Sequence, residues 1–186
     1  RGQMVTTQGV VVGLFEGNYS AGGVFDGFFL QDAQGDGDPA TSDGVFVQGY
    51  ADVNVGDWLA VTGTVREFDE YDGAACQLDC LTEIRLEAGN YHLLGQGSVT
   101  PTVIIPLGDP AAGAAYFESL EGMLTQFPLT ATVVGPTSYG AVTVIPGSEP
   151  VTRVLRHSPQ EGMPFGVRHW LRFGGSIPPQ LNVGSV

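Results

Sequence analysis

The first chemistry that the residues suggest is cation binding, in an acidic loop that runs from Asp32 to Asp43. Side chains with oxygen donors recur through it, and the candidate metal ligands are Asp32, Gln34, Asp36, Asp38 and Asp43. Calcium takes about six to eight oxygen ligands, several of them carboxylates. The spacing therefore predicts a Ca²⁺ site, although the bidentate glutamate of the helix–loop–helix calcium motif is missing. The alternative is a solvated hairpin loop whose aspartates cap turns.

A second candidate site is a basic and aromatic cluster near the C-terminus. If residues 151–157 and 167–173 pair as strands, alternation places the last three members of the cluster on one face. Such a face could hold phosphates and stack bases. The alternative is a set of structural ion pairs with glutamates of this chain or with acids of another subunit. The cluster comprises Arg153, Arg156, Arg168, Trp170 and Arg172.

Catalytic motifs are not evident in the sequence. The three histidines lie in none of the familiar catalytic patterns, and neither a G-x-S-x-G elbow nor a Walker loop occurs. Neighbouring acids such as Glu67 and Asp69 could exchange protons, but a solvated strand end is the favoured explanation of them. The sequence therefore predicts a protein that is not an enzyme.

The two cysteines, Cys76 and Cys80, lie close together in "CQLDC". Zinc normally takes four ligands, and only His92 lies near them in sequence. We expect a disulfide that closes a small loop, with two free thiols as the alternative. A disulfide would indicate an oxidising compartment, so we expect an extracellular or cell-surface protein. No apolar run is long enough to predict a membrane span.

Charge divides the chain into two unlike halves. The 186 residues carry a net charge of −13 and contain no lysine. Residues 1–93 hold 15 acids against three arginines, whereas residues 94–186 hold five acids against four arginines. Because phosphate binding depends on positive charge, the first half should repel polyanions. Any affinity for nucleic acid should be weak and sensitive to salt.

Short runs of strand-forming residues between glycines, prolines and aspartates predict an all-β protein. The expected strands of the first half are 4–15, 23–32, 44–50, 53–68 and 80–97. Within the fourth, Leu59 and Val61 should share one face, and Trp58 should lie on the other. Gly9 and Gly13 should let the first strand bulge or coil. One short helix is expected within 109–123, ended by Gly122.

Four segments together resemble a known family: "QGVVVGLF", "GFFLQDAQGDGDPATSDGVFV", "VGDWLAVTGTVREF" and "LTEI". They are similar to the OB-fold region of secreted bacterial nucleases, which precedes a catalytic domain of the endonuclease/exonuclease/phosphatase type. The resemblance implies an OB-like five-stranded barrel over residues 1–97. A second small β-rich module with one short helix would follow over 98–186. The insertion "DGAACQLDC" departs from the family, and the chain from Arg153 onward does not align with it.

Two functions follow as hypotheses. The first is a non-catalytic OB-fold module of a secreted nuclease-like protein, with weak binding of single-stranded nucleic acid or an accessory role, and a calcium-stabilised acidic loop. The second is a structural subunit of an extracellular filament or surface assembly. In that case an acidic N-terminal half and an arginine-containing C-terminal half would meet head to tail, and exposed strand edges would pair between subunits.

Overall fold

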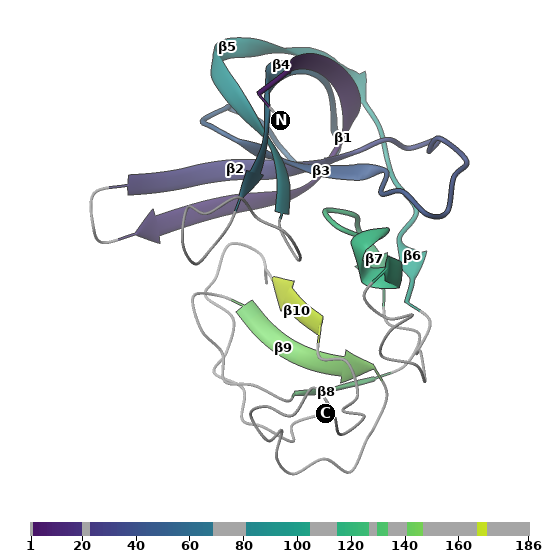
Figure 1. The fold of residues 1–186 in the computed structure, drawn as a ribbon. Helices are drawn as coiled ribbons and strands as arrows, with labels where there is room; N and C mark the ends of the chain where they lie inside the picture. The colour runs from purple at the N-terminus through teal and green to yellow at the C-terminus, as the bar shows by residue number, and fades with distance from the viewer. Residues whose placement is uncertain are drawn as a thin grey trace. The chain divides into compact units, whose positions relative to one another are not determined.

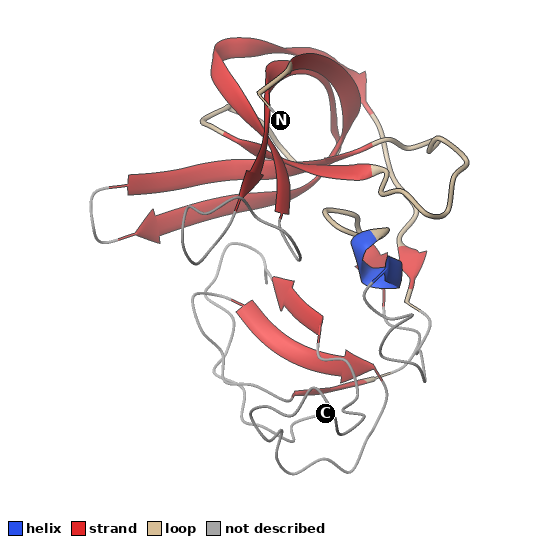
Figure 2. Ribbon diagram, viewed as in Figure 1, coloured by secondary structure: helices blue, strands red, loops and turns tan. Residues whose placement is uncertain are grey.

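The structure, a computed structural model, describes residues 2–19, 23–68, 81–104, 115–126, 130–133, 141–146 and 167–170. These segments are mainly β-strands, with one short helix at residues 115–118 (Figure 2). The all-β fold predicted from the sequence is therefore confirmed. Within these ranges, none of the helical structure has the length and apolar character that crossing a membrane requires.

The first five strands form a closed barrel (Figure 1). They are β1 (Met4–Tyr19), β2 (Gly23–Gln31), β3 (Gly44–Gln48), β4 (Asp57–Phe68) and β5 (Leu81–Gln96). Their order is β1-β2-β3-β5-β4, and β1 also pairs with β4, so the sheet closes on itself. All neighbours are antiparallel except β3 and β5, which run parallel. The five expected strands thus lie at the expected places in the chain.

Alternating side chains fill the barrel. Leu59 and Val61 are 0% exposed, whereas Trp58 on the other face of β4 is 41% exposed, as the alternation predicted. Burial of such apolar side chains is the main favourable term in folding. The core residues are Val11, Phe28, Leu30, Val47, Val53, Leu59, Val61, Ile84 and Leu86.

Strand β1 bends where two glycines were expected to permit it. Its register against β2 shifts between Val11 and Gly13, which is the signature of a bulge. At Gly9, a Cβ atom would lie 2.8 Å from the carbonyl oxygen of Gln31. Only a residue without a side chain allows the two backbones to approach this closely.

The chain divides into two compact units. The first contains Arg1–Thr102 and also Glu118–Thr125, and the second contains Val103–Phe117 and Gln126–Val186. The sequence division into 1–97 and 98–186 places Glu118–Thr125 after the boundary, whereas the contacts assign this segment to the barrel unit. We call Glu118–Thr125 the strap.

The strap begins where the helix ends. The helix was expected within 109–123 with Gly122 at its end, but it stops at residue 118. Residues 119–122 form turns, in which Glu121 and Met123 donate their N–H groups to the carbonyls of Glu118 and Leu120. Other polar groups of the strap bond to the barrel, among them the carbonyl of Glu121. Gly122 therefore lies in the turns after the helix, with a φ of 69° that glycine adopts readily.

The remaining strands are short. Strands β6 (Thr102–Val103) and β7 (Thr125–Gln126) form a two-stranded sheet. In the second unit, β8 (Ala131–Val133), β9 (Ala141–Pro146) and β10 (Val167–Trp170) form an antiparallel sheet in the order β10-β9-β8. The strand that the sequence predicted over 151–157 lies outside the described residues.

Candidate functional site

The strand register brings aromatic and basic residues together on the outside of the barrel. Phe29 of β2 pairs with Phe46 of β3, Phe46 with Glu83 of β5, and Glu83 with Arg66 of β4. These positions alternate with core residues on every strand, so they form one row across the outer surface.

A second outer row lies beside the first. It passes from Phe15 to Gly27, then to Gln48, Arg85 and Thr64. Neighbouring strands are about 5 Å apart, so the two rows bring aromatic rings and guanidinium groups onto one continuous surface. We call the set Phe15, Phe29, Phe46, Arg66 and Arg85 the aromatic–arginine face.

The three phenylalanines of this face pack against one another. The ring centroid of Phe46 lies 6.0 Å from that of Phe15 and 5.1 Å from that of Phe29. Gly27 makes room for this cluster, because a Cβ atom there would collide with the ring of Phe46. Phe46 itself is 7% exposed, whereas Phe15 and Phe29 are half-buried. Phe46 therefore supports the cluster, and the other two rings offer the accessible aromatic surface.

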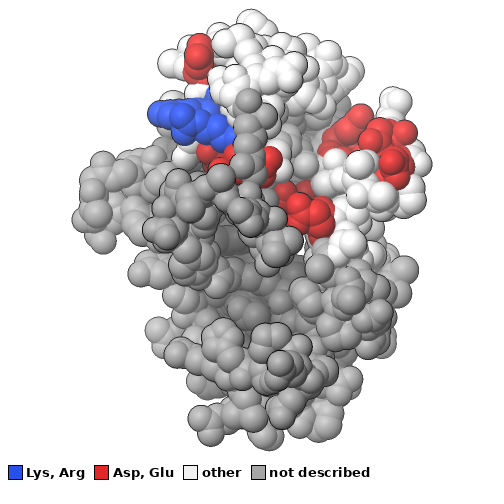
Figure 3. Space-filling view, in the orientation of Figure 1, with Lys and Arg blue, Asp and Glu red and all other residues white. Residues whose placement is uncertain are grey.

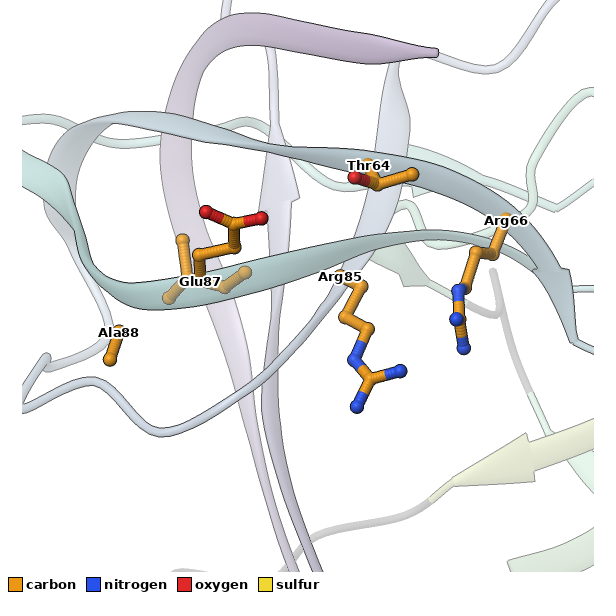
Figure 4. Close-up of a pocket in the computed structure, with 6 residues that line it drawn as sticks. Thr64, Arg66, Arg85, Glu87 and Ala88 are labelled. Atoms are coloured by element: carbon orange, nitrogen blue, oxygen red, sulfur yellow. The ribbon is translucent and has the colours of Figure 1, made fainter. Parts of the chain in front are cut away.

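The two arginines border a hollow of about 480 Å³. Both side chains are exposed and extend to the same side of strands β4 and β5 (Figure 4). The volume falls in the range of small-molecule pockets, about 300 to 1,000 Å³. The lining residues are Thr64, Arg66, Arg85, Leu86, Glu87 and Ala88. Planar guanidinium groups at such a site suit phosphate or carboxylate oxygens.

Glu83 is a buried carboxylate between these arginines. It is 4% exposed although it lies on the outer side of β5. Burial raises the pKa of Glu83, and the charges of Arg66 and Arg85 oppose that rise. The arginines thus serve two ends at once: they compensate a buried acid and they present cations to solvent.

Acidic side chains lie beside the two arginines as well as in the acidic loop. Figure 3 shows the basic side chains as one patch with acidic side chains next to it, and a further dense acidic group lies where Figure 1 places the β2–β3 loop. Glu87 lines the same hollow as Arg66 and Arg85. These acids limit the size of any anion-binding surface on the barrel.

The acidic loop uses its carboxylates to organise its own backbone. Asp32 accepts the N–H of Gln34 at 2.9 Å, and Asp38 accepts the N–H of Ala40 at 3.0 Å. Asp36 accepts the N–H of Asp38 at 2.7 Å. Bonds of this i to i+2 type are Asx turns, which stabilise tight changes of chain direction.

Asp43 joins the two ends of this loop. Its side chain accepts the N–H of Asp36 at 3.0 Å, and its carbonyl accepts the N–H of Asp32 at 2.9 Å. Asp36 also accepts the hydroxyl of Thr41 at 2.9 Å. The backbone bond from Asp38 and the hydroxyl of Thr41 together lower the pKa of Asp36.

These bonds account for the loop as capped turns, the alternative that the sequence left open. Gln34 contributes its backbone N–H to them. Across the described part of the chain, no group of three or more acids, histidines or cysteines is arranged to hold a metal ion. Calcium binding by the loop stays a prediction.

The other sequence-predicted sites are described only in part. Arg153, Arg156 and Arg172 lie outside the described residues, as do Cys76 and Cys80 of the expected disulfide. The backbones of Arg168 and Trp170 belong to β10, where they pair with Thr143 and Ala141 of β9. The two positions share one face of that strand, as alternation predicted.

The aromatic–arginine face was not identified from the sequence. In the sequence, Arg66 and Arg85 contribute only as two of the three arginines of the acidic first half. Alternation along β4 and β5 identifies both arginines as outward positions. The missing information was the register of β3 against β5, because that pairing joins the aromatic strands to the basic ones.

Comparison with known proteins gives no relative: no protein-family profile matches the chain, and no curated protein or solved structure matches it.

Proposed function

We propose that the chain contains a non-catalytic OB-fold binding module that holds short single-stranded nucleic acid weakly. The strand order β1-β2-β3-β5-β4, with β3 parallel to β5, supports the OB-like assignment. OB folds use the outer face of strands two and three to bind oligonucleotides. Phe29 and Phe46 of the aromatic–arginine face lie on β2 and β3, and its arginines lie on the neighbouring strands β4 and β5.

The observation that carries the proposal is the meeting of two half-buried phenylalanines with two exposed arginines across one surface. Bases stack on aromatic rings without strong sequence preference, and arginines bind the intervening phosphates. The distance from Phe29 to Arg66 covers three strand spacings, or about 14 Å. A ligand of only a few nucleotides would fill it.

Weak affinity follows from the charge. With a net charge of −13, the molecule as a whole repels a polyanion, and the barrel presents two described cations on this face. We therefore expect dissociation constants in the range of non-specific binding, about 10⁻⁴ to 10⁻⁶ M. An accessory role beside a secreted nuclease, in an extracellular or cell-surface location, is consistent with such affinity.

Fluorescence anisotropy with a labelled single-stranded oligodeoxythymidylate tests the proposal. Arg66→Gln and Phe29→Leu should each weaken binding several-fold, since they remove a phosphate contact and a stacking surface. Gln8→Glu is the matched control, because it changes the net charge by the same single unit as Arg66→Gln at an exposed position of β1. Equal weakening by Gln8→Glu and Arg66→Gln would show that only bulk charge matters.

We also propose that calcium stabilises the acidic loop. The motivation is the density of carboxylates between Asp32 and Asp43, which repel one another unless a cation or water screens them. A calorimetric Ca²⁺ titration of the full chain should give heat that Asp36→Ala and Asp38→Ala reduce. A wild-type titration without heat would leave the turn bonds as the complete explanation of the loop.

The assembly hypothesis combines a charge argument with strand edges that would pair between subunits. Its motivation is the contrast between the acidic first half and the more nearly neutral second half. Electron microscopy of the purified chain tests it, because head-to-tail contacts that do not close generate long polymers. Monodisperse particles at low and high salt would remove this alternative.

A further inference from the structure

The strap, Glu118–Thr125, is held on the barrel by hydrogen bonds from three different segments. The hydroxyl of Ser42 donates to the carbonyl of Glu121 at 2.5 Å. The N–H of Leu124 donates to the side-chain oxygen of Gln31 at 2.8 Å, and the carbonyl of Leu124 accepts the N–H of Thr102 at 2.9 Å. These bonds tie a distant part of the sequence to β2 and to the end of the acidic loop.

Two glycines let the strap lie directly on the barrel backbone. A Cβ atom on Gly44 would lie 2.5 Å from the carbonyl carbon of Gly122. Gly122 also has a φ of 69°, which other residues rarely adopt. The backbone of the strap is therefore in direct contact with the backbone of Gly44, the first residue of β3.

A fourth attachment passes through a carboxylate. Glu121 accepts the backbone N–H of Thr82, the second residue of β5, at 3.1 Å. The hydroxyl of the same threonine donates to Glu67 of β4 at 3.3 Å. Thr82 thus links two carboxylates from different segments, and Glu118 of the strap adds a third acid that acts on Glu121.

We propose that the strap is a proton-controlled latch, docked on the barrel while Glu121 is protonated and released when Glu121 ionises beside Glu67 and Glu118. The half-buried position of Glu121 is the reason. A negative charge on Glu121 is poorly solvated while the strap is docked, and the acids Glu67 and Glu118 repel it. Undocking exposes the Glu121 carboxylate to water.

Titration of Glu121 supports the latch. Burial, together with the charges of Glu118 and Glu67, raises the pKa of Glu121 to about 7, against the opposing bond from Thr82. In the undocked strap its pKa should return to the ordinary value of 4.5. A raised pKa in the docked state means that docking is strongest below 4.5 and weakens as the pH rises toward about 7.

The groups around Glu121 explain the direction of the effect. Glu67 faces it from β4, and Glu118 lies on its own segment. On β5, the uncharged Thr82 donates its backbone N–H to the Glu121 carboxylate. In the acidic loop, the hydroxyl of Ser42 donates to the Glu121 backbone carbonyl. The charged groups that act on Glu121 among the described residues are thus both acids, so its ionisation meets repulsion.

Amide hydrogen exchange of the full chain, followed by NMR between pH 5 and pH 8, tests the latch. After correction for intrinsic exchange, protection of the Thr82 and Leu124 amides should fall about tenfold across this range. Glu121→Gln should abolish the fall, because an amide keeps an acceptor for Thr82 without a charge. Asp52→Asn, at an exposed position outside the cluster, should keep the wild-type profile.

Two results would overturn the latch. The first is a fall of the same size in wild type and in Glu121→Gln, or no fall in wild type. The second is an equal loss of protection at the core amide of Val61, since this would report global unfolding rather than release of the strap. If Glu121→Gln does not fold, Glu118→Gln at an exposed position replaces it. The latch then requires that protection of the Thr82 and Leu124 amides falls less between pH 5 and pH 8 in Glu118→Gln than in wild type.

Discussion

At the scale of single residues, the acidic loop shows aspartates acting as backbone acceptors. Four backbone N–H groups within it bond to aspartate side chains. An aspartate that caps a turn offers its oxygen where the chain would otherwise leave a donor unpaired. The spacing that suggested metal ligands therefore also suits a series of local turns, and sequence spacing alone does not separate the two.

Two glycines of this loop provide a matched test of its packing. Gly35 and Gly37 both have positive φ values, 69° and 81°. A Cβ atom on Gly35 would lie 2.8 Å from Asp43 Oδ2, whereas nothing lies within 4 Å of one on Gly37. Gly37→Ala should cost about 1 kcal/mol for its backbone conformation. Gly35→Ala should cost about 2 kcal/mol or more.

Urea denaturation of the two variants measures this difference. Because the backbone penalty is shared, the excess cost of Gly35→Ala reports the contact with Asp43. Equal costs would mean that the Asp43 side chain moves away freely, and that its bond to the N–H of Asp36 does not hold the loop together.

The buried carboxylate of Glu83 predicts a pH-dependent role for Arg66. Without this arginine the pKa of Glu83 should rise further, because one of the two opposing charges is lost. Stability carried by a raised pKa is present below the unfolded value near 4.5 and is lost as the pH rises. Arg66→Gln should therefore lower the free energy of unfolding by about 1 kcal/mol at pH 7.5 and far less at pH 4.

Urea denaturation at both pH values checks this expectation, and Glu83→Gln supplies the control background. In that background Arg66→Gln should have little effect at either pH, because no buried charge remains to be compensated. A loss of the same size in both backgrounds would assign the role of Arg66 to packing of its aliphatic stem.

At the scale of elements, the strands of the barrel could be predicted because each carries its own pattern. Leu59 and Val61 alternate with polar or small residues, and this alternation is sufficient to place one face of β4 in the core. The bulge in β1 was predictable from Gly13. These features depend on neighbours in the sequence, so local reasoning finds them.

The strap could not be predicted in the same way. Its partners, Gln31, Ser42 and Thr82, lie 39 to 93 residues away in the chain. Its apolar residues and its glycine are equally compatible with a place in a second module. The aromatic–arginine face escaped prediction for the same reason, since it depends on the parallel register of β3 with β5.

The contact between the strap and β3 yields a prediction about Gly44. Gly44→Ala would place a methyl group against the backbone of Gly122, so the strap should lose its docked position while the barrel stays folded. Protection of the Leu124 amide should fall several-fold more than that of Val61. Gly13→Ala is the control, because its Cβ atom would meet Phe29 at an ordinary 3.5 Å.

An equal fall of protection at Leu124 in both glycine variants would contradict this expectation. It would mean that the strap responds to any strain in the barrel, and that the close approach of Gly44 and Gly122 has no special role in docking.

At the scale of the whole molecule, charge decides what kind of ligand the chain can hold. Most of the net charge of −13 belongs to the first half, and four of the seven arginines lie in the second half. An anionic ligand on the barrel is therefore repelled by the surrounding acids. The second half, which contains Arg153, Arg156, Arg168 and Arg172, carries few acids and would repel it much less. The salt dependence of binding separates these two arrangements.

For single-stranded nucleic acid, the slope of log K against log salt is about −0.7 for each phosphate that is neutralised. Binding through Arg66 and Arg85 alone should give a slope of about −1.4. Recruitment of the four C-terminal arginines as well should steepen it to about −4. Anisotropy titrations from 20 to 200 mM NaCl, roughly the range over which screening changes most, measure the slope directly.

With Arg66→Gln the shallow slope should fall by about half, because one of its two phosphate contacts is gone. A steep slope that Arg66→Gln leaves unchanged would move the binding site off the barrel and onto the second unit.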